Sequence, residues 1–200
     1  TGSFTKIKCS NDGYEGWCQS AQLAIIPDEM MMRKSNAIMP DYSNSLLLNG
    51  AKMQVPFGAS LSLFQTQQLS LPGLTFQYEG NIFIPGVIPF TPESVKQVAA
   101  LFINTPYLWG GRSVFGIDCS GFVQQVYAYF NIQLPRDAYQ QAGMGKDIGF
   151  LAETICGDLA YFDNKEGKIT HVGIMLDAQT IIHASGRVRI DYIDQAGILN

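Results

Sequence analysis

The feature that most constrains the fold is a change of pattern near residue 91. Before it, short alternating stretches such as 4–9 and 16–19 are separated by turn residues such as 11–14, which is typical of β-hairpins. Thr91-Pro92-Glu93 then begins a helix, with Thr as N-cap and Pro at the first helical position. The sequence therefore predicts a β-rich first part and an α+β second part.

The first part contains a second β-like stretch from about residue 43 to residue 86. Its turn residues are Asn49-Gly50, Gly58, Pro72-Gly73 and Glu79-Gly80. Short strands at such spacing favour small β-barrels. We therefore expect three domains, at residues 1–40, 41–90 and 91–200.

The second part begins with helices and continues with strands. Val95, Val98, Ala99 and Phe102 mark one face of the first helix, which Thr105-Pro106 ends. A second helix follows Asp118, with Phe122, Val123, Val126, Tyr127 and Phe130 on its buried side. Strands are expected at 159–163, 169–176, 181–184 and 188–192, forming an antiparallel sheet.

Composition excludes some classes of partner. The 13 Lys and Arg against 17 Asp and Glu give a net charge of −4, and no basic run points to nucleic acid or to an anionic membrane surface. No stretch approaches the ~20 apolar residues of a membrane span. Both ends read as cut, since no closing element follows residues 197–199, so an upstream leader or lipoprotein anchor stays open.

The four cysteines fit no zinc pattern. Cys9 and Cys18 lie in the first predicted hairpin, where they either pair or are buried free thiols. Cys156 reads as part of the core. Cys119 differs because it begins the helix after Asp118. A helix N-terminus stabilises a thiolate, and a nearby imidazole can take the proton.

The chain's two histidines, His171 and His183, fall in strands after this helix. Val172, Ile174 and Leu176 form the core face of the first strand, and Gly173 leaves room for a substrate backbone on the histidine face. An odd loop of three or five residues, or a bulge, places both histidines on one face toward Cys119. His183 then orients His171.

These residues resemble the NlpC-type family of bacterial cell-wall cysteine peptidases, which are papain-like. Tyr-x-Trp-Gly-Gly (107–111), Asp-Cys-Ser-Gly (118–121), His-Val-Gly-Ile (171–174) and Ile-His-Ala (182–184) follow the family's order. The resemblance implies a Cys119, His171 and His183 triad, a thioester acyl-enzyme, and no metal or organic cofactor.

Leu134-Pro135-Arg136-Asp137 is similar to a motif of the γ-D-glutamyl-L-diamino acid endopeptidases. That likeness implies that Asp137 binds the free amine of an N-terminal L-Ala in peptidoglycan stem peptides. The alternative is that Asp137 is a helix N-cap. Further substrate-lining positions match, although Ala138 replaces the family's usual Ser. They are Tyr107, Trp109, Asp118 (a cap or a substrate contact) and Ser120.

The first part resembles bacterial SH3-like modules through residues 14–17, and Glu15 is a candidate contact at the closed side of the cleft. The expected fold is thus α+β, a papain-like domain after two small SH3-like barrels. Two alternatives remain: an amidase or acyltransferase on this fold, and a non-catalytic wall-binding protein. SH3-like modules favour the cell envelope or periplasm, with a lipoprotein or cytoplasmic peptide recycling left open. Lysine versus meso-diaminopimelate on the leaving side, and the oligomeric state, stay undecided.

Overall fold

The computed structural model describes residues 3–31 and 35–199. The chain divides into two compact units, Thr1–Pro85 and Gly86–Asn200, and each has its own β-sheets. The β-rich character predicted for the first part is confirmed, whereas its assignment to two SH3-like modules at 1–40 and 41–90 stays a prediction.

The first unit begins with the predicted hairpin, β1 (Phe4–Lys8) against β2 (Glu15–Gln19). Thr5 lies opposite Cys18, and Cys9 bonds to Tyr14 at the turn end. The two cysteines are therefore four residues apart along the ladder, about 13 Å. A disulfide needs Cα atoms within about 7 Å, so Cys9 and Cys18 do not pair. Both are free and half-exposed, and the prediction of buried thiols is wrong.

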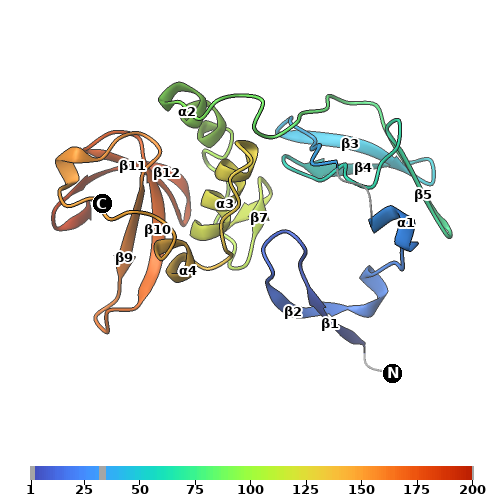
Figure 1. Cartoon of the computed structure of the whole chain (residues 1–200), viewed down its shortest axis with the longest axis horizontal. Coiled ribbons are helices and arrows are strands. Elements are labelled where there is room, and N and C mark those ends of the chain that lie inside the picture. Colours follow the sequence, from blue (N-terminus) through green and yellow to red (C-terminus); the bar gives the residue numbers. More distant parts are fainter. Residues whose placement is uncertain (1–2, 32–34, 200) are drawn as a thin grey trace. The chain divides into compact units, whose positions relative to one another are not determined.

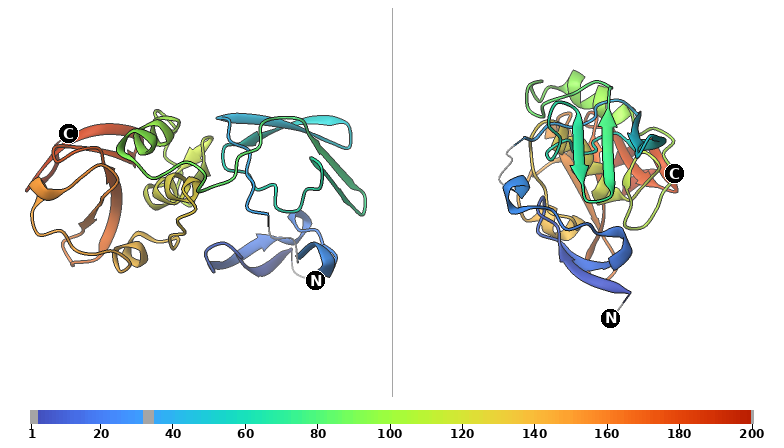
Figure 2. Two further views of the ribbon diagram at one scale, coloured as in Figure 1. Left: turned by 45° about the horizontal axis from the view of Figure 1, so that its top comes forward. Right: turned by 90° about the vertical axis from the view of Figure 1, so that its right-hand side faces the viewer.

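A four-stranded antiparallel sheet follows, with the order β4-β3-β6-β5. Asn49 and Gly50 join β3 to β4 with φ angles of 49° and 83°, the left-handed conformation that two-residue hairpin turns require. Figure 2 shows β5 and β6 running side by side in opposite directions. A core of Ala37, Met39, Leu46, Leu61 and Tyr78 packs in this unit. The remaining bounds are η1 (Ser20–Gln22), α1 (Asp28–Met31), β3 (Ser43–Leu48), β4 (Ala51–Pro56), β5 (Gln68–Leu71) and β6 (Leu74–Tyr78).

The second unit is built on a five-stranded antiparallel sheet of order β13-β12-β11-β10-β9, which is strongly curved (Figure 1). The four predicted strands are confirmed, and residues 197–199, to which the sequence assigned no strand, form the edge strand β13 against β12. The bounds are β9 (Leu159–Asp163), β10 (Ile169–Met175), β11 (Thr180–Ser185), β12 (Arg187–Asp194) and β13 (Gly197–Leu199).

The helices begin where their capping residues predict. Thr91 and Ser94 form a capping box at α2 (Pro92–Ala100), and the four residues predicted on its core face are all buried. α3 (Cys119–Tyr129) packs on β10 and β11, and the ring of Phe122 meets that of Phe102 edge-to-face at 5.6 Å. The hairpin β7 (Arg112–Ser113) with β8 (Gly116–Ile117) and the short helix η2 (Leu151–Glu153) were not predicted. α4 (Ala138–Ala142) has Asp137 as its N-cap, as the alternative interpretation of that residue predicted.

Two burial predictions in this unit are wrong. Only the face of residues 172, 174 and 176 was expected to be core, but Met175, which lies on the face of His171, joins Ile181 and Ile193 in a second buried cluster. The curvature of the sheet brings β12 and β13 around to cover it. Cys156, predicted in the core, is half-exposed beside the Pro92 carbonyl, 3.6 Å from its sulfur.

Within the described ranges, none of the helices is both long and apolar enough to span a bilayer.

Candidate active site

Cys119 is the first residue of α3, at the N-terminal end of the helix. Asp118 is its N-cap, with extended backbone angles of −97° and 177°, and its Oδ1 accepts the Gly121 N–H at 2.8 Å. The cap predicted for Asp118 is therefore confirmed. The thiol therefore lies at the positive end of the helix dipole. Only 7% of Cys119 is exposed.

The glycine-rich approach folds back against this helix start. Asp118 donates its N–H to the Gly111 carbonyl at 3.2 Å, and Gly110 donates to Asp118 Oδ2 at 2.9 Å. A Cβ at Gly121 would lie 2.5 Å from the Gly111 oxygen, so only glycine permits this backbone approach. The segment 110–121 is thus a tight loop around the Asp118 carboxylate.

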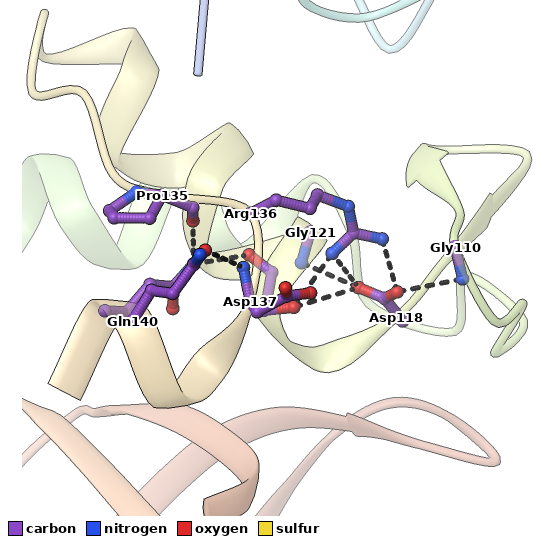
Figure 3. Close-up of polar contacts among 9 residues, drawn as sticks. Gly110, Asp118, Gly121, Pro135, Arg136, Asp137 and Gln140 are labelled. Carbon is purple, nitrogen blue, oxygen red and sulfur yellow. Dashed lines mark hydrogen bonds and ion pairs between the residues drawn. The ribbon is translucent and has the colours of Figure 1, made fainter. Parts of the chain in front are cut away.

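Arg136 completes the enclosure of Asp118 (Figure 3). Its Nη1 donates to Asp118 Oδ1 at 3.0 Å and its Nη2 to Oδ2 at 2.5 Å, the bidentate geometry of strong charge-assisted pairs. Nη1 also donates to Ser120 Oγ at 2.8 Å. All three side chains are buried. Sequence reasoning assigned Arg136 no role, and its only signal was its place beside Asp137 in the Leu134–Asp137 motif.

The two histidines lie side by side on neighbouring strands. Gly173 on β10 lies opposite His183 on β11, which puts His171 diagonally across from His183 on the same face. Nε2 of His171 lies 2.8 Å from Nδ1 of His183. Leu176 and Thr180 close the hairpin through a backbone bond. The loop between them has three residues, as predicted.

Gly173 has a different role from the one predicted. A Cβ there would lie 2.6 Å from Ile181 Cδ1 and 2.8 Å from His183 Cβ. The space above this glycine is therefore filled by the neighbouring strand and does not receive a substrate backbone. Gly173 instead allows His183 to pack closely across the strand pair.

A carboxylate that sequence reasoning missed lies behind His183. Asp191 Oδ2 is 2.9 Å from His183 Nε2 and also accepts the Arg189 Nε–H at 2.7 Å. Both residues lie on β12, where Arg189 is opposite His183 and Asp191 is opposite Ile181. The alternation of β12 carried the only signal, because residues 189 and 191 share one face.

Burial favours uncharged forms of the central groups. It raises the pKa of the Cys119 thiol, as does the charge of Asp118, although the Val172 backbone N–H acts in the opposite direction. Burial and the neighbouring His183 lower the pKa of His171 to about 4. Burial also lowers the pKa of His183, against the effect of Asp191. These shifts favour a thiol and two neutral imidazoles near pH 7 over a thiolate and an imidazolium.

The remaining predicted residues differ in exposure. Tyr107 is half-buried, and the charges of Cys119 and Asp118 help burial to raise its pKa. Asp137 stands at the N-cap of α4, where its N–H donates to Gln140 Oε1 at 3.3 Å. Trp109 is 85% exposed, and the structure does not bring it into the Cys119 and histidine constellation.

A cavity of about 760 Å³ lies beside α3, α4 and β9. Its lining does not include Cys119 or either histidine, although one wall residue, Phe162, packs its ring 5.7 Å from that of His171. Across the described ranges, the structure gathers no group of three His, Cys, Asp or Glu residues able to hold a metal ion.

Comparison with known proteins places this constellation in a family. Residues 104–199 match the model of the NlpC/P60 family. A probable endopeptidase of Haemophilus influenzae is 35% identical over 136 residues, covering 67% of this chain and 82% of that protein. A Gamma-D-glutamyl-L-lysine dipeptidyl-peptidase of Bacillus subtilis is 42% identical over 96 residues, covering 47% of this chain. The chain spans only 32% of the length of that relative.

The fold is also known. The crystal structure of an NlpC/P60 family protein from Bacillus cereus superposes on 98% of this chain with a TM-score of 0.80, at 22% identity and over 73% of its own length. At that identity the likeness shows the shared mixed α/β fold alone.

Proposed function

This chain belongs to the NlpC/P60 family, and on that premise we propose that it is a cysteine peptidase of peptidoglycan. The proposed reaction hydrolyses the bond between γ-D-Glu and the L-diamino acid in stem peptides that begin with a free L-Ala. The observation that carries the proposal is the His171–His183 pair on the strands against which the Cys119 helix packs. The names of the relatives from B. subtilis and H. influenzae agree with it.

The proposed mechanism follows from the neutral resting state. His171 takes the thiol proton as the Cys119 sulfur attacks the γ-glutamyl carbonyl. The Cys119 N–H, at the N-terminus of α3, donates to the developing oxyanion. His171 then gives the proton to the departing amine of the diamino acid, which leaves a thioester on Cys119. Water, deprotonated by His171, hydrolyses the thioester and regenerates the thiol.

Substrate selection is assigned to residues around this centre. We propose that the Asp137 carboxylate binds the ammonium of L-Ala, and that Tyr107 and Trp109 line the peptide. Asp118 and Ser120 have their polar atoms engaged with Arg136, which favours a role in positioning Cys119 over contact with substrate. We further propose that residues 1–40 and 41–90 are SH3-like modules and that the protein acts in the cell envelope.

Mass spectrometry of L-Ala-γ-D-Glu-meso-diaminopimelate tests the reaction. We expect wild type to release L-Ala-γ-D-Glu, Cys119→Ala to release none, and the N-acetylated peptide to resist cleavage. Loss of a charged hydrogen bond of about 1.5–3 kcal/mol predicts a 10- to 100-fold lower kcat/KM for Asp137→Asn. The exposed carboxylate of Asp163 offers a matched control, because Asp163→Asn should leave kcat/KM unchanged.

The other outcomes discriminate among the remaining functions. Equal cleavage of the acetylated peptide keeps the peptidase and refutes the role of Asp137. Transfer of the dipeptide to an added amine, with hydrolysis slower than transfer, indicates an acyltransferase. Absence of any product, with binding of the peptide retained, indicates a non-catalytic wall-binding protein.

A further inference from the structure

Asp191, His183 and His171 form a row of hydrogen bonds, and in each bond only one of the two partners can be the donor. At one end lies Asp191, whose Oδ2 is contacted by His183 Nε2 at 2.9 Å and by Arg189 Nε at 2.7 Å. At the other end, His171 Nε2 lies 2.8 Å from His183 Nδ1. Each ring nitrogen in the row must therefore be a donor or an acceptor according to the group it faces.

The carboxylate decides the direction. Burial acts to raise the pKa of Asp191, but the hydrogen bonds from His183 and Arg189 outweigh it and lower that pKa, so the group is ionised at neutral pH. An ionised carboxylate only accepts hydrogen bonds. His183 must then carry its proton on Nε2, and its Nδ1 holds a lone pair. His171 can donate to that lone pair only from a protonated Nε2.

We propose that Asp191 is a positioning residue that sets the tautomers of both histidines, so that Nδ1 of His171 is left unprotonated as the base for Cys119. This inference rests on the proposed function, in which His171 takes the thiol proton. Nδ1 is the one ring nitrogen of His171 that His183 does not engage. With the reverse tautomers, Nδ1 would carry a hydrogen and could not accept the proton.

Arg189 makes the arrangement one-directional. A guanidinium has donors and no acceptor, so the oxygen that it contacts on residue 191 must be an acceptor. In Asp191→Asn, Arg189 would hold the amide oxygen at this place and His183 Nε2–H could still donate to it. The asparagine variant is thus expected to keep the tautomers, whereas Asp191→Leu removes the acceptor altogether.

Nitrogen-15 NMR of the imidazole rings reads the tautomers directly and needs no substrate. The chain has two histidines, so one His171→Gln sample assigns both rings. At pH 7.5 we expect wild type and Asp191→Asn to show Nε2–H on both rings, and Asp191→Leu to show a mixture on both. The measurement works even if the peptidase reaction proposed above is wrong, which keeps the two failures distinguishable.

Kinetics supply the second readout. Removing the carboxylate that orients the catalytic histidine of serine peptidases lowers kcat by about 10⁴. Here the carboxylate acts through a further ring, and loss of the comparable outer partners of metal-bound histidines costs about 10- to 100-fold. We expect a loss of that size in kcat and in Cys119 alkylation by iodoacetamide for Asp191→Leu, with KM unchanged and most activity restored in Asp191→Asn.

Two results would overturn the proposal. One is a wild-type His183 with its proton on Nδ1, which needs no variant to observe. The other is an Asp191→Leu protein that is folded, has wild-type tautomers and alkylates at the wild-type rate.

Discussion

Replacing Arg136 by Met should destabilise the second unit more than any change of a surface charge. The Arg136 guanidinium and the Asp118 carboxylate are 10% and 9% exposed and are joined by two hydrogen bonds. Met fills a similar volume but provides no donor. The substitution would leave a buried carboxylate that keeps its bonds from the Gly110 and Gly121 N–H groups and a longer one, at 3.4 Å, from the Ser120 hydroxyl.

The magnitude follows from the cost of an uncompensated buried charge. Removing one partner of a buried ion pair costs about 3–5 kcal/mol, and the two backbone donors place this case near the lower end, about 3 kcal/mol. For a unit of this size, about 4 °C of Tm is lost per kcal/mol. Arg136→Met should therefore lower Tm by about 12 °C.

A double-mutant cycle on the whole chain separates charge from packing. Asp118→Asn removes the charge that Arg136→Met leaves without its partner. The double variant should therefore recover about half of the stability lost in Arg136→Met, with a coupling free energy of about 1–3 kcal/mol. Urea unfolding followed by circular dichroism measures each corner. A single-variant loss below about 1 kcal/mol, or strictly additive losses in the double variant, would refute the reasoning. Arg136→Lys should fall between wild type and Met, since an ammonium cannot make the bidentate pair.

Two further predictions concern the histidine strands. Gly173→Ala should lower the free energy of unfolding by about 1–3 kcal/mol and lower kcat, because the new methyl group would lie less than 3 Å from Ile181 and His183. Gly143→Ala is the control, since a methyl group there has no contact closer than 3.6 Å. Equal urea midpoints for the two variants would contradict the packing argument. The pKa of His171, lowered to about 4, means that the unfolded chain takes up a proton below pH 6.5 before the folded chain does. The contribution of His171 to the free energy of unfolding is therefore complete above pH 6.5 and is lost as the pH falls toward 4. At ~1.36 kcal/mol per pKa unit, the loss reaches about 3 kcal/mol. Urea titrations should show the free energy of unfolding falling over this pH range in the wild type but not in His171→Gln. The value of kcat/KM should stay constant through pH 6.5, and a fall in kcat/KM centred at pH 6.5 would refute the lowered pKa.

The parts of the site that could be predicted from sequence are those set by neighbours along the chain. Thr91-Pro92 and Asp118 begin their helices because capping depends on three or four consecutive residues. The shared face of His171 and His183 followed from the parity of 12 residues and an odd loop. Both signals are local, and neither needs a partner from elsewhere in the fold.

The parts that could not be predicted depend on which segments meet. Arg136 and Asp118 are 18 residues apart, and no periodicity relates a loop residue before α4 to the cap of α3. Asp191 reaches His183 only through the β11–β12 register. The role of Gly173 could not be predicted for the same reason. The space that a side chain at 173 would occupy is filled by residues of the neighbouring strand.

Both missed contacts solve the same electrostatic problem. A carboxylate next to a nucleophilic thiol opposes formation of the thiolate, and the charge of Asp118 does raise the pKa of Cys119. A carboxylate is nevertheless suited to a helix cap and to the hydrogen-bonded row behind a histidine. Because an ionised carboxylate only accepts, it fixes which partner is the donor in each of its hydrogen bonds. Pairing Asp118 with Arg136 and Asp191 with Arg189 supplies the acceptor and places a positive charge beside it. The site can therefore hold the Cys119 helix and the His171 ring in place without adding net negative charge beside a sulfur that must become an anion.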